Sequence, residues 1–395
     1  MRSPAARRIW TAALGAVVFA SCASPPERPA DLPSPRGPEP IVFEAIALDT
    51  TVAPPPFVVL DAIVYSEALR DPALKVEVDR WIRRFTESDP ESFRIYLQRM
   101  TRYAALVDSV LIERELPSSL RYLPIVESGY LPTAVSSASA AGLWQFMGPV
   151  ARDFGLQVDP LVDERRDPIA ATDGATQFLG ELHDRFDSWF LALAAYNGGP
   201  NRVDRLLREH VPFAPGGDSL FMRIRPYLPR ETQDFVPKFL AVAEVARQAD
   251  KLGLAPDLDA SHAPLAFDEV EVPDATSLDI VAAAAGVAEA EVLDLNPQIV
   301  RGVTPRGSVT RLRLPVGAAG TFAAIYPTIP PEDRVTVTEY VVRSGDTFSE
   351  IAEDFGVRTS ELQAANPGID ARRLQIGTRL IVPVAPGAAD QIRRR

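Results

Sequence analysis

Cysteine and histidine are scarce in this chain of 395 residues, which has one cysteine and three histidines. Since Cys22 has no second cysteine to pair with, an intrachain disulfide is excluded. His183, His210 and His262 lie far apart and show no metal-ligand spacing, so we interpret them as solvated or locally hydrogen-bonded side chains. We therefore expect neither a metal site nor a cofactor.

Positive charge and long apolar runs are also limited. Lys and Arg total 41 against 53 Asp and Glu, and the formal charge of −12 argues against a nucleic-acid partner. The apolar run at 9–20 is too short for a comfortable membrane span. Because it follows Arg2, Arg7 and Arg8, we predict a secretory signal peptide at 1–21. The 46% hydrophobic content and the length allow two or three domains with ordinary cores.

The lone cysteine directly follows this predicted signal peptide. Residues 19–22 resemble a bacterial lipobox, although Phe19 replaces the usual leucine. We predict lipidation of Cys22 and anchoring by acyl chains; the alternative is an ordinary signal peptide with an incidental cysteine. Ala23, rather than an aspartate, favours the outer membrane, so we expect a periplasmic lipoprotein anchored to that bilayer. The proline-rich stretch 22–56 is then a semi-rigid tether.

Apolar side chains recur at three- and four-residue steps between Val64 and Leu116, which predicts helices. Several of these residues are aromatic, namely Trp81, Phe85, Phe93, Tyr96 and Tyr103. We interpret them as core packing. The segment 57–116 is thus expected to be a helical brace for the lobe that follows.

One carboxylate, Glu127, is the first candidate for chemistry. Ser118 and Ser119 can cap a helix on which Leu120, Leu123 and Glu127 share one stripe. Since that stripe is otherwise apolar, the carboxylate should be buried and protonated, as a general acid must be. The alternative is an exposed, idle glutamate at a fraying helix end.

Two further segments could line a cleft beside this glutamate. Gln145 is the polar residue of the bulky apolar run 142–147, so it can offer a donor and an acceptor at the wall of a cleft. The Gly-Gly-Pro run at 198–200 ends a helix and leaves Tyr196 and Asn197 at its last turn. Further helices are predicted at 145–154, 168–186, 188–196, 199–209 and 231–251.

Together, Glu127-Ser128-Gly129, Gly142-Leu143-Trp144-Gln145-Phe146 and Ala195-Tyr196-Asn197-Gly198-Gly199 resemble the motifs of the soluble-lytic-transglycosylase family, in its order and spacing. The resemblance covers roughly 60–250 and 265–384. It implies a goose-lysozyme-like catalytic domain at 117–255. The expected fold class is α+β multidomain, a mostly α-helical lysozyme-like catalytic domain followed by two small β-α-α-β modules.

The resemblance also implies an activity on peptidoglycan glycan strands. In that reaction Glu127 protonates the β-1,4 bond between N-acetylmuramic acid and N-acetylglucosamine, then accepts the proton of the C6 hydroxyl as a 1,6-anhydro ring closes. The substrate-binding residues that the resemblance implies are Ser128, Gln145, Met147, Tyr196, Asn197 and Phe235. The family usually has tyrosine at the position of Phe235, so here the ring lacks its oxygen.

No second carboxylate lies in a cleft motif, whereas ordinary glycosidases use two. Asp163, Asp167 and Asp234 are candidates, but each has a charged or exposed-looking context. We interpret the charge run 163–167 as an ion-pair network that fixes a loop. A lysozyme-type hydrolase remains an alternative, as does a non-catalytic glycan-binding scaffold. The products separate the lytic reaction, which leaves anhydro ends, from the hydrolase, which leaves reducing ends.

The carboxyl-terminal region contains an internal repeat. Gly356-Val357 and Asn366-Pro367 recur 70 residues earlier as Gly286-Val287 and Asn296-Pro297. The second copy, 338–384, resembles a LysM module with a capping box from Thr347 to Glu350. The resemblance implies glycan binding in its loops, by Gly345, Asp346, Thr347, Asn366 and Pro367. The first copy, 264–318, lacks the loop glycine and is expected to be a degenerate, structural module.

Overall fold

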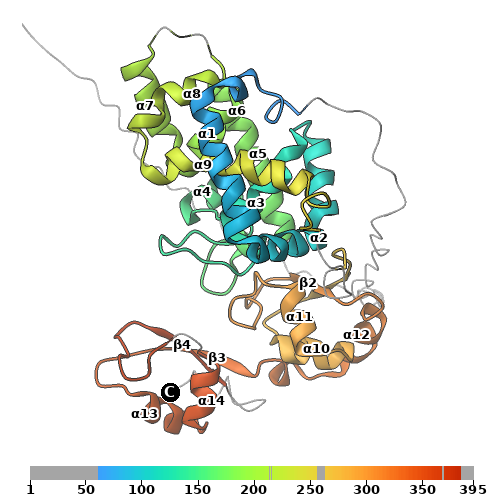
Figure 1. Ribbon diagram of the computed structural model, residues 1–395. Helices are drawn as coiled ribbons and strands as arrows, with labels where there is room; N and C mark the ends of the chain where they lie inside the picture. Colours follow the sequence, from blue (N-terminus) through green and yellow to red (C-terminus); the bar gives the residue numbers. More distant parts are fainter. Residues whose placement is uncertain (1–60, 213, 215, 256–262, 367–368, 384–395) are drawn as a thin grey trace, which may run out of the picture. The chain divides into compact units, whose positions relative to one another are not determined.

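A computed structural model describes residues 61–212, 214, 216–255, 263–366 and 369–383 (Figure 1). The predicted signal peptide at 1–21, the tether at 22–56 and its Cys22 lie outside the described residues, as does Pro367. Within the described ranges, no helix has both the length and the apolar composition needed to cross a membrane.

The described chain begins with the short helical turn η1 (Glu67–Arg70) and two longer helices, α1 (Pro72–Arg83) and α2 (Pro90–Glu113). Asp71 caps α1 by accepting hydrogen bonds from the amides of Ala73 and Leu74, and a proline occupies the first position of each helix. A π-helical turn, η2 (Arg84–Ser88), joins α1 to α2. Helices are therefore present where the apolar pattern predicts them.

The following region consists of helices around a buried central one. Trp189 to Ala195 of α6 (Trp189–Gly198) are all buried, because this helix is apolar all round. Helix α1 packs along α9, and α5 and α9 both pack against α6 (Figure 1). The remaining helices of this region are α3 (Leu123–Ser128), α4 (Gly148–Asp153), α5 (Pro168–Phe186), α7 (Pro200–His210), α8 (Ser219–Ile224) and α9 (Arg230–Arg247).

The predicted serine cap before Glu127 is wrong. The segment Ser118–Tyr122 is a 3-10 helix, η3, and neither serine caps it. Instead Asp61 accepts hydrogen bonds from the Ser119 amide (2.5 Å) and from the hydroxyls of both serines (2.9 and 3.1 Å). A distant carboxylate thus satisfies the orphan donors of this helix start, which local sequence could not indicate.

The helix predicted at 145–154 starts only at Gly148. Ala141 and Phe146 pair through their backbones, so the segment between them is a tight turn. In this turn Gln145 has a φ of +49°, a left-handed value that is uncommon for a residue with a side chain. The other predicted helices of this region are confirmed to within a few residues, and α6 ends at the Gly-Gly-Pro run as expected.

Both carboxyl-terminal copies have the predicted order of strand, two helices and strand. The first comprises β1 (Asp268–Val272), α10 (Leu278–Ala285), α11 (Glu289–Leu295) and β2 (Thr310–Leu314), and the helix α12 (Ala319–Ile325) follows it. The second comprises β3 (Val337–Val341), α13 (Phe348–Asp354), α14 (Thr359–Ala364) and β4 (Arg379–Pro383). In each copy the two strands form an antiparallel sheet.

Candidate active site

Glu127 lies in the last turn of α3, just before a sharp change in chain direction. Gly129 and Tyr130 both have left-handed backbones, with φ of +60° and +59°, so the helix ends there. A Cβ on Gly129 would lie 2.6 Å from the ring of Tyr96, which only glycine avoids. The backbone therefore brings the carboxylate to the end of a helix that packs against α9.

Glu127 lines a cavity of about 460 Å³. Trp81 and Tyr96, predicted as core, are half-buried and line this cavity, whereas Phe93 is fully buried. Both aromatics also pack against the hydrophobic core, so the prediction of core packing is confirmed, and the first two helices form a wall of the cavity in addition. The other lining residues are Arg84, Phe85, Asp89, Ser92, Ile125, Val126, Ser128, Gly129, Ala134, Val135, Ser136, Gln145 and Lys238.

Burial raises the pKa of Glu127 to about 8; the Lys238 ammonium lowers it and the Glu231 carboxylate raises it. Although Glu127 as a residue is only half-buried, its carboxyl group is surrounded by protein, so water solvates the charged form poorly. At neutral pH the neutral acid is the favoured form, so Glu127 can act as a proton donor.

Ser128 and Gln145 lie in the same cavity, as the motifs suggest. The Ser128 hydroxyl donates to the carbonyl of Leu143 (2.9 Å) and accepts from the amide of Leu131 (3.2 Å). The Gln145 side-chain nitrogen donates to the carbonyl of Gly142 (2.9 Å). Both side chains thus hold the turn that forms one wall of the cavity, which leaves less of their hydrogen-bonding capacity for a ligand.

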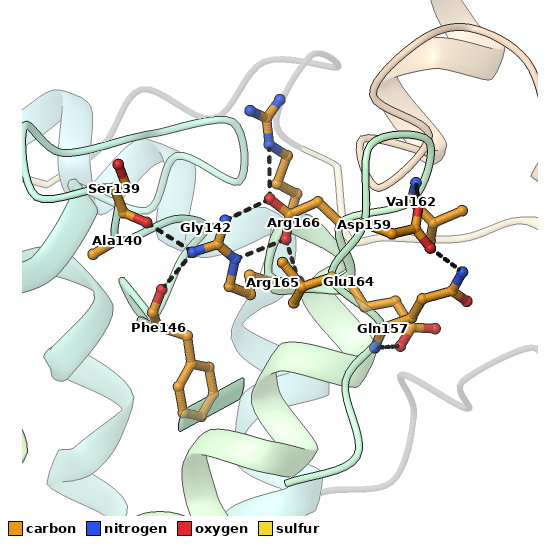
Figure 2. A network of polar contacts seen from close by, with 12 residues as sticks. Ser139, Ala140, Gly142, Phe146, Gln157, Asp159, Val162, Glu164, Arg165 and Arg166 are labelled. Atoms are coloured by element: carbon orange, nitrogen blue, oxygen red, sulfur yellow. Dashed lines mark hydrogen bonds and ion pairs between the residues drawn. The ribbon is translucent and has the colours of Figure 1, made fainter. Parts of the chain in front are cut away.

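Arg165 fixes this turn from behind (Figure 2). Two of its nitrogens donate to the two carboxylate oxygens of Asp163, each at 2.8 Å, and a third donates to the carbonyls of Ser139 (2.7 Å) and Phe146 (3.0 Å). Both charged side chains are about nine-tenths buried. The charge run at 163–167 therefore forms the expected ion-pair network, and it holds the cavity wall.

The turn at 141–146 and the charged loop at 163–167 approach each other so closely that only glycine fits at position 142. A Cβ on Gly142 would lie 1.6 Å from the carbonyl oxygen of Arg165. The amide of Gly142 meanwhile donates to the carbonyl of Ala134 (2.9 Å). The glycine of the Gly-Leu-Trp-Gln-Phe motif is thus required by backbone contact.

Tyr196 and Asn197 occupy the last turn of α6, as predicted, but neither is among the residues that line the cavity. The Tyr196 hydroxyl donates to the carbonyl of Trp144 (2.7 Å). Burial, and then the Glu127 charge, raise the pKa of Tyr196. Asn197 accepts from the Thr232 hydroxyl (2.7 Å) and donates to Glu231 (3.2 Å). These contacts tie the end of α6 to the cavity wall and to α9.

Met147 and Phe235 also lie outside the cavity lining. Met147 precedes α4 and is 43% exposed, and Phe235 is buried in the hydrophobic core on α9. Tyr227 is near Phe235 in the chain and is therefore a second candidate to supply the oxygen that Phe235 lacks; it is 55% exposed, and its ring stacks on that of His210 at 3.6 Å. Lys238 also lines the cavity, as do Arg84 and Asp89, which lie outside the sequence motifs.

The candidate second carboxylates are occupied elsewhere. Asp163 pairs with Arg165, and Asp167 caps α5 by accepting from the amide of Ile169 (2.8 Å). Asp234 lies between arginines, 2.7 Å from Arg80 and 3.4 Å from Arg230. None of the three lines the cavity, where Asp89 is the carboxylate that accompanies Glu127.

In the second repeat, the first loop is shaped by Gly345, Asp346 and Thr347. Gly345 has a φ of +97°, and Asp346 accepts from the Tyr340 hydroxyl (2.7 Å) and the Arg343 amide (2.6 Å). Thr347 and Glu350 form the predicted capping box.

The prediction that Asn366 contacts a glycan is not supported by its surroundings. Its side chain is 2% exposed, and it donates to the carbonyls of Leu362 and Ile381 and accepts from the Ile381 amide. Asn296 makes the equivalent bonds to Val292 and Arg313 in the first repeat. The repeated asparagine therefore joins the second helix to the last strand.

The corresponding loops of the first repeat are bonded to each other. The Thr276 amide donates to the Thr304 hydroxyl (2.9 Å), and the Thr304 amide donates to the Thr276 carbonyl (3.0 Å). Gly307 donates its amide to the Asp274 carboxylate (2.7 Å). These hydrogen bonds tie the two loops of the first repeat directly to each other.

Three family descriptions match the chain. Residues 111–212 match "Transglycosylase SLT domain", residues 340–383 match "LysM domain", and residues 266–331 match "Lytic transglycosylase MltD, LysM-like domain". The family resemblance read from the motifs is thereby confirmed.

Similar proteins are known from bacteria. Membrane-bound lytic murein transglycosylase D of Escherichia coli is 32% identical over 291 residues, which are 70% of this chain and 62% of that protein. A putative tributyltin chloride resistance protein of an Alteromonas species is 37% identical over 110 residues, 28% of this chain and 53% of that protein. The chain thus spans less than two thirds of the length of either relative.

Among solved structures, an inactive mutant of lytic transglycosylase Slt from Pseudomonas aeruginosa matches with 25% identity and a TM-score of 0.32. The match covers 42% of this chain and 26% of that one.

Proposed function

We propose that this chain, with its transglycosylase SLT domain and its LysM modules, is a peptidoglycan lytic transglycosylase. It would cleave the β-1,4 bond between N-acetylmuramic acid and N-acetylglucosamine and leave 1,6-anhydro ends. The observation that supports this most directly is Glu127, whose pKa is raised to about 8 by burial and which lines the cavity together with the motif residues Ser128, Gly129 and Gln145.

The proposed reaction uses Glu127 twice. The neutral carboxyl first donates its proton to the glycosidic oxygen, and the bond from that oxygen to C1 of the muramoyl residue breaks. The resulting carboxylate then accepts the proton of the C6 hydroxyl as its oxygen attacks C1. Because the attacking group belongs to the substrate, the step benefits from a high effective molarity and needs no water. Glu127 returns to its starting form.

Digestion of purified peptidoglycan with mass analysis of the products tests the proposal. The wild type should release muropeptides with anhydro ends, whereas a lysozyme-type hydrolase would leave reducing ends. Glu127→Gln should lower the rate by at least about 100-fold, since one general acid–base group is typically worth that much. If Glu127→Gln kept most of the wild-type activity, the chemistry would belong to another residue.

A periplasmic location at the outer membrane is proposed together with this activity. It rests on the signal-like segment 1–21 and the lipobox-like residues before Cys22, and a relative bears the name "membrane-bound". Cys22→Ala should move the protein from the membrane fraction to the soluble periplasmic fraction. An unchanged distribution after fractionation would exclude this lipid as the anchor.

A further inference from the structure

Lys238 reaches the candidate active site from α9. It follows Pro237, a proline inside the helix. Because Pro237 has no N–H, the carbonyl of Gln233 is left free of its helical partner and accepts from the Arg225 side chain (2.8 Å) instead. The helix therefore continues through the proline, and the next residue faces the end of α3.

The Lys238 ammonium is held in place by two contacts. It donates to the carbonyl of Val126 (3.1 Å), the residue directly before Glu127. It also lies 5.7 Å from the centre of the Trp81 ring, within the range of a cation–π interaction. Both partners line the cavity with Glu127, so the cation is half-buried at its edge.

Titratable groups act on Glu127 from several elements. From α9 come Lys238 and Glu231, which act on Glu127 with opposite signs. Tyr196 approaches from α6, and its pKa responds to the Glu127 charge. Arg84 and Asp89 line the cavity from the junction of α1 and α2 and lie 3.8 Å apart as an ion pair. Among the residues that the structure describes, Lys238 makes no ion pair with a carboxylate, and its charge acts on Glu127 against that of Glu231.

We propose that Lys238 is a positioning residue that stabilises the carboxylate form of Glu127 between its two proton transfers. This inference rests on the proposed function. Lys238 itself gives up no proton: the proton passes from Glu127 to the leaving oxygen, and a second proton returns from the C6 hydroxyl to Glu127. A fixed cation beside the transient anion lowers its free energy without further reorganisation.

The alternative is a purely structural role for Lys238. The carbonyl of Val126 belongs to the last turn of α3, where carbonyls lack helical partners, so Lys238 could simply cap that helix. The chain offers a matched control for this reading. Arg99 donates to the carbonyl of Gly129 (3.3 Å) at the same helix end, and it is not among the cavity-lining residues.

The test is the pH dependence of kcat/KM for glycan cleavage by the full chain. In Lys238→Met the decline of activity at high pH should move upward by about half to one pH unit, since a neighbouring cation is lost. The kcat at neutral pH should fall by about 10-fold or more. Lys238→Arg should restore both values in large part, and Arg99→Met should leave the position of the decline unchanged.

An unchanged position of the decline in Lys238→Met would overturn the inference, and so would an equal shift in Arg99→Met. If Lys238→Met does not fold, Lys238→Gln gives the same comparison. Product analysis keeps this result separate from the proposed function. Reducing ends from the wild type would refute the lytic reaction, while the pH shift would still report whether Lys238 acts on Glu127.

Discussion

At the scale of single residues, Glu127 combines two properties that are usually opposed. It is charged in the unfolded chain at neutral pH, yet the fold favours its neutral form because burial raises its pKa from 4.5 to about 8. The fold thus sacrifices some stability to hold a proton where the chemistry needs it. This cost can be measured.

Glu127→Gln should be more stable than the wild type at pH 7.5, because the glutamine requires no protonation on folding. With the folded pKa above the unfolded value, the stabilising contribution of the protonated acid is complete below about pH 4.5 and is lost as pH rises towards 8. The gain of the variant should be about 1–3 kcal/mol, after allowance for the partial exposure of the residue. Denaturant unfolding at pH 4 and pH 7.5 measures it, and equal differences at both values would contradict the prediction.

Phe235→Tyr restores the hydroxyl that the family usually has. Phe235 precedes Lys238 by three residues on α9, so the two side chains lie on similar faces of that helix. Phe235 does not itself line the cavity, but a hydroxyl added on the helix face of Lys238 should gain a hydrogen bond and raise kcat/KM by about 2–10-fold.

Tyr227→Phe is the control for this variant. Steady-state assays of both variants on one glycan decide whether position 235 lacks the oxygen or Tyr227 already supplies it. Tyr227 is mostly exposed and stacked on His210, so its loss should have little effect. Lower activity in Phe235→Tyr would mean that the added oxygen crowds the core.

At the scale of elements, the cavity wall depends on the loop at 163–167 that lies behind it. The wall turn contains a left-handed glutamine, an unfavourable conformation that must be held by its surroundings. Arg165 supplies that support, with its charge neutralised by Asp163 and its other donors on the carbonyls of the wall. The motif residues around position 145 can therefore act only when this second loop is in place.

Arg165→Met should lower the free energy of unfolding by about 3–5 kcal/mol, because it leaves the buried Asp163 carboxylate with only the longer ion-pair contact to Arg166, at 3.8 Å. Activity should fall as well, since the wall is released. Arg205→Met is the matched control: Arg205 pairs with Glu209 on the surface of α7, with side chains 55% and 48% exposed. Arg205→Met should lower the free energy of unfolding by at most about 0.5 kcal/mol. Thermal and denaturant melts compare the two, and similar losses in both would refute the assigned role.

At the scale of the whole molecule, the two carboxyl-terminal repeats share a fold but not their loops. In the first, the loops are bonded to each other through Thr276 and Thr304. In the second, the first loop is shaped by Gly345 and Asp346. We infer that the second repeat carries the glycan binding and that the first has a structural role.

A chain that ends at residue 333 should therefore bind insoluble peptidoglycan more weakly than the full chain, and its anhydro products should be unchanged. Co-sedimentation with purified cell wall measures the bound fraction. As a control, Asp274→Ala in the full chain alters the loops of the first repeat and should leave binding unchanged. Equal sedimentation of the shortened and full chains would show that the first repeat, or the catalytic domain, is sufficient.

Local chemistry in the sequence determined much of this protein. The apolar periodicity determined most helices, the Gly-Gly-Pro run determined the end of α6, and the repeated Asn-Pro pairs marked two modules of one fold. The motifs also indicated Glu127, because a carboxylate on an apolar stripe is a local pattern.

Only the tertiary structure decided which distant groups meet. Asp61 replaces the expected serine caps, Trp81 and Tyr96 line the cavity instead of only filling the core, and Lys238 lies over the helix that carries Glu127. Such contacts join residues more than twenty-five positions apart, and their partners are chosen by packing. The pKa of Glu127 belongs to this class as well, since it depends on burial and on charges from another helix.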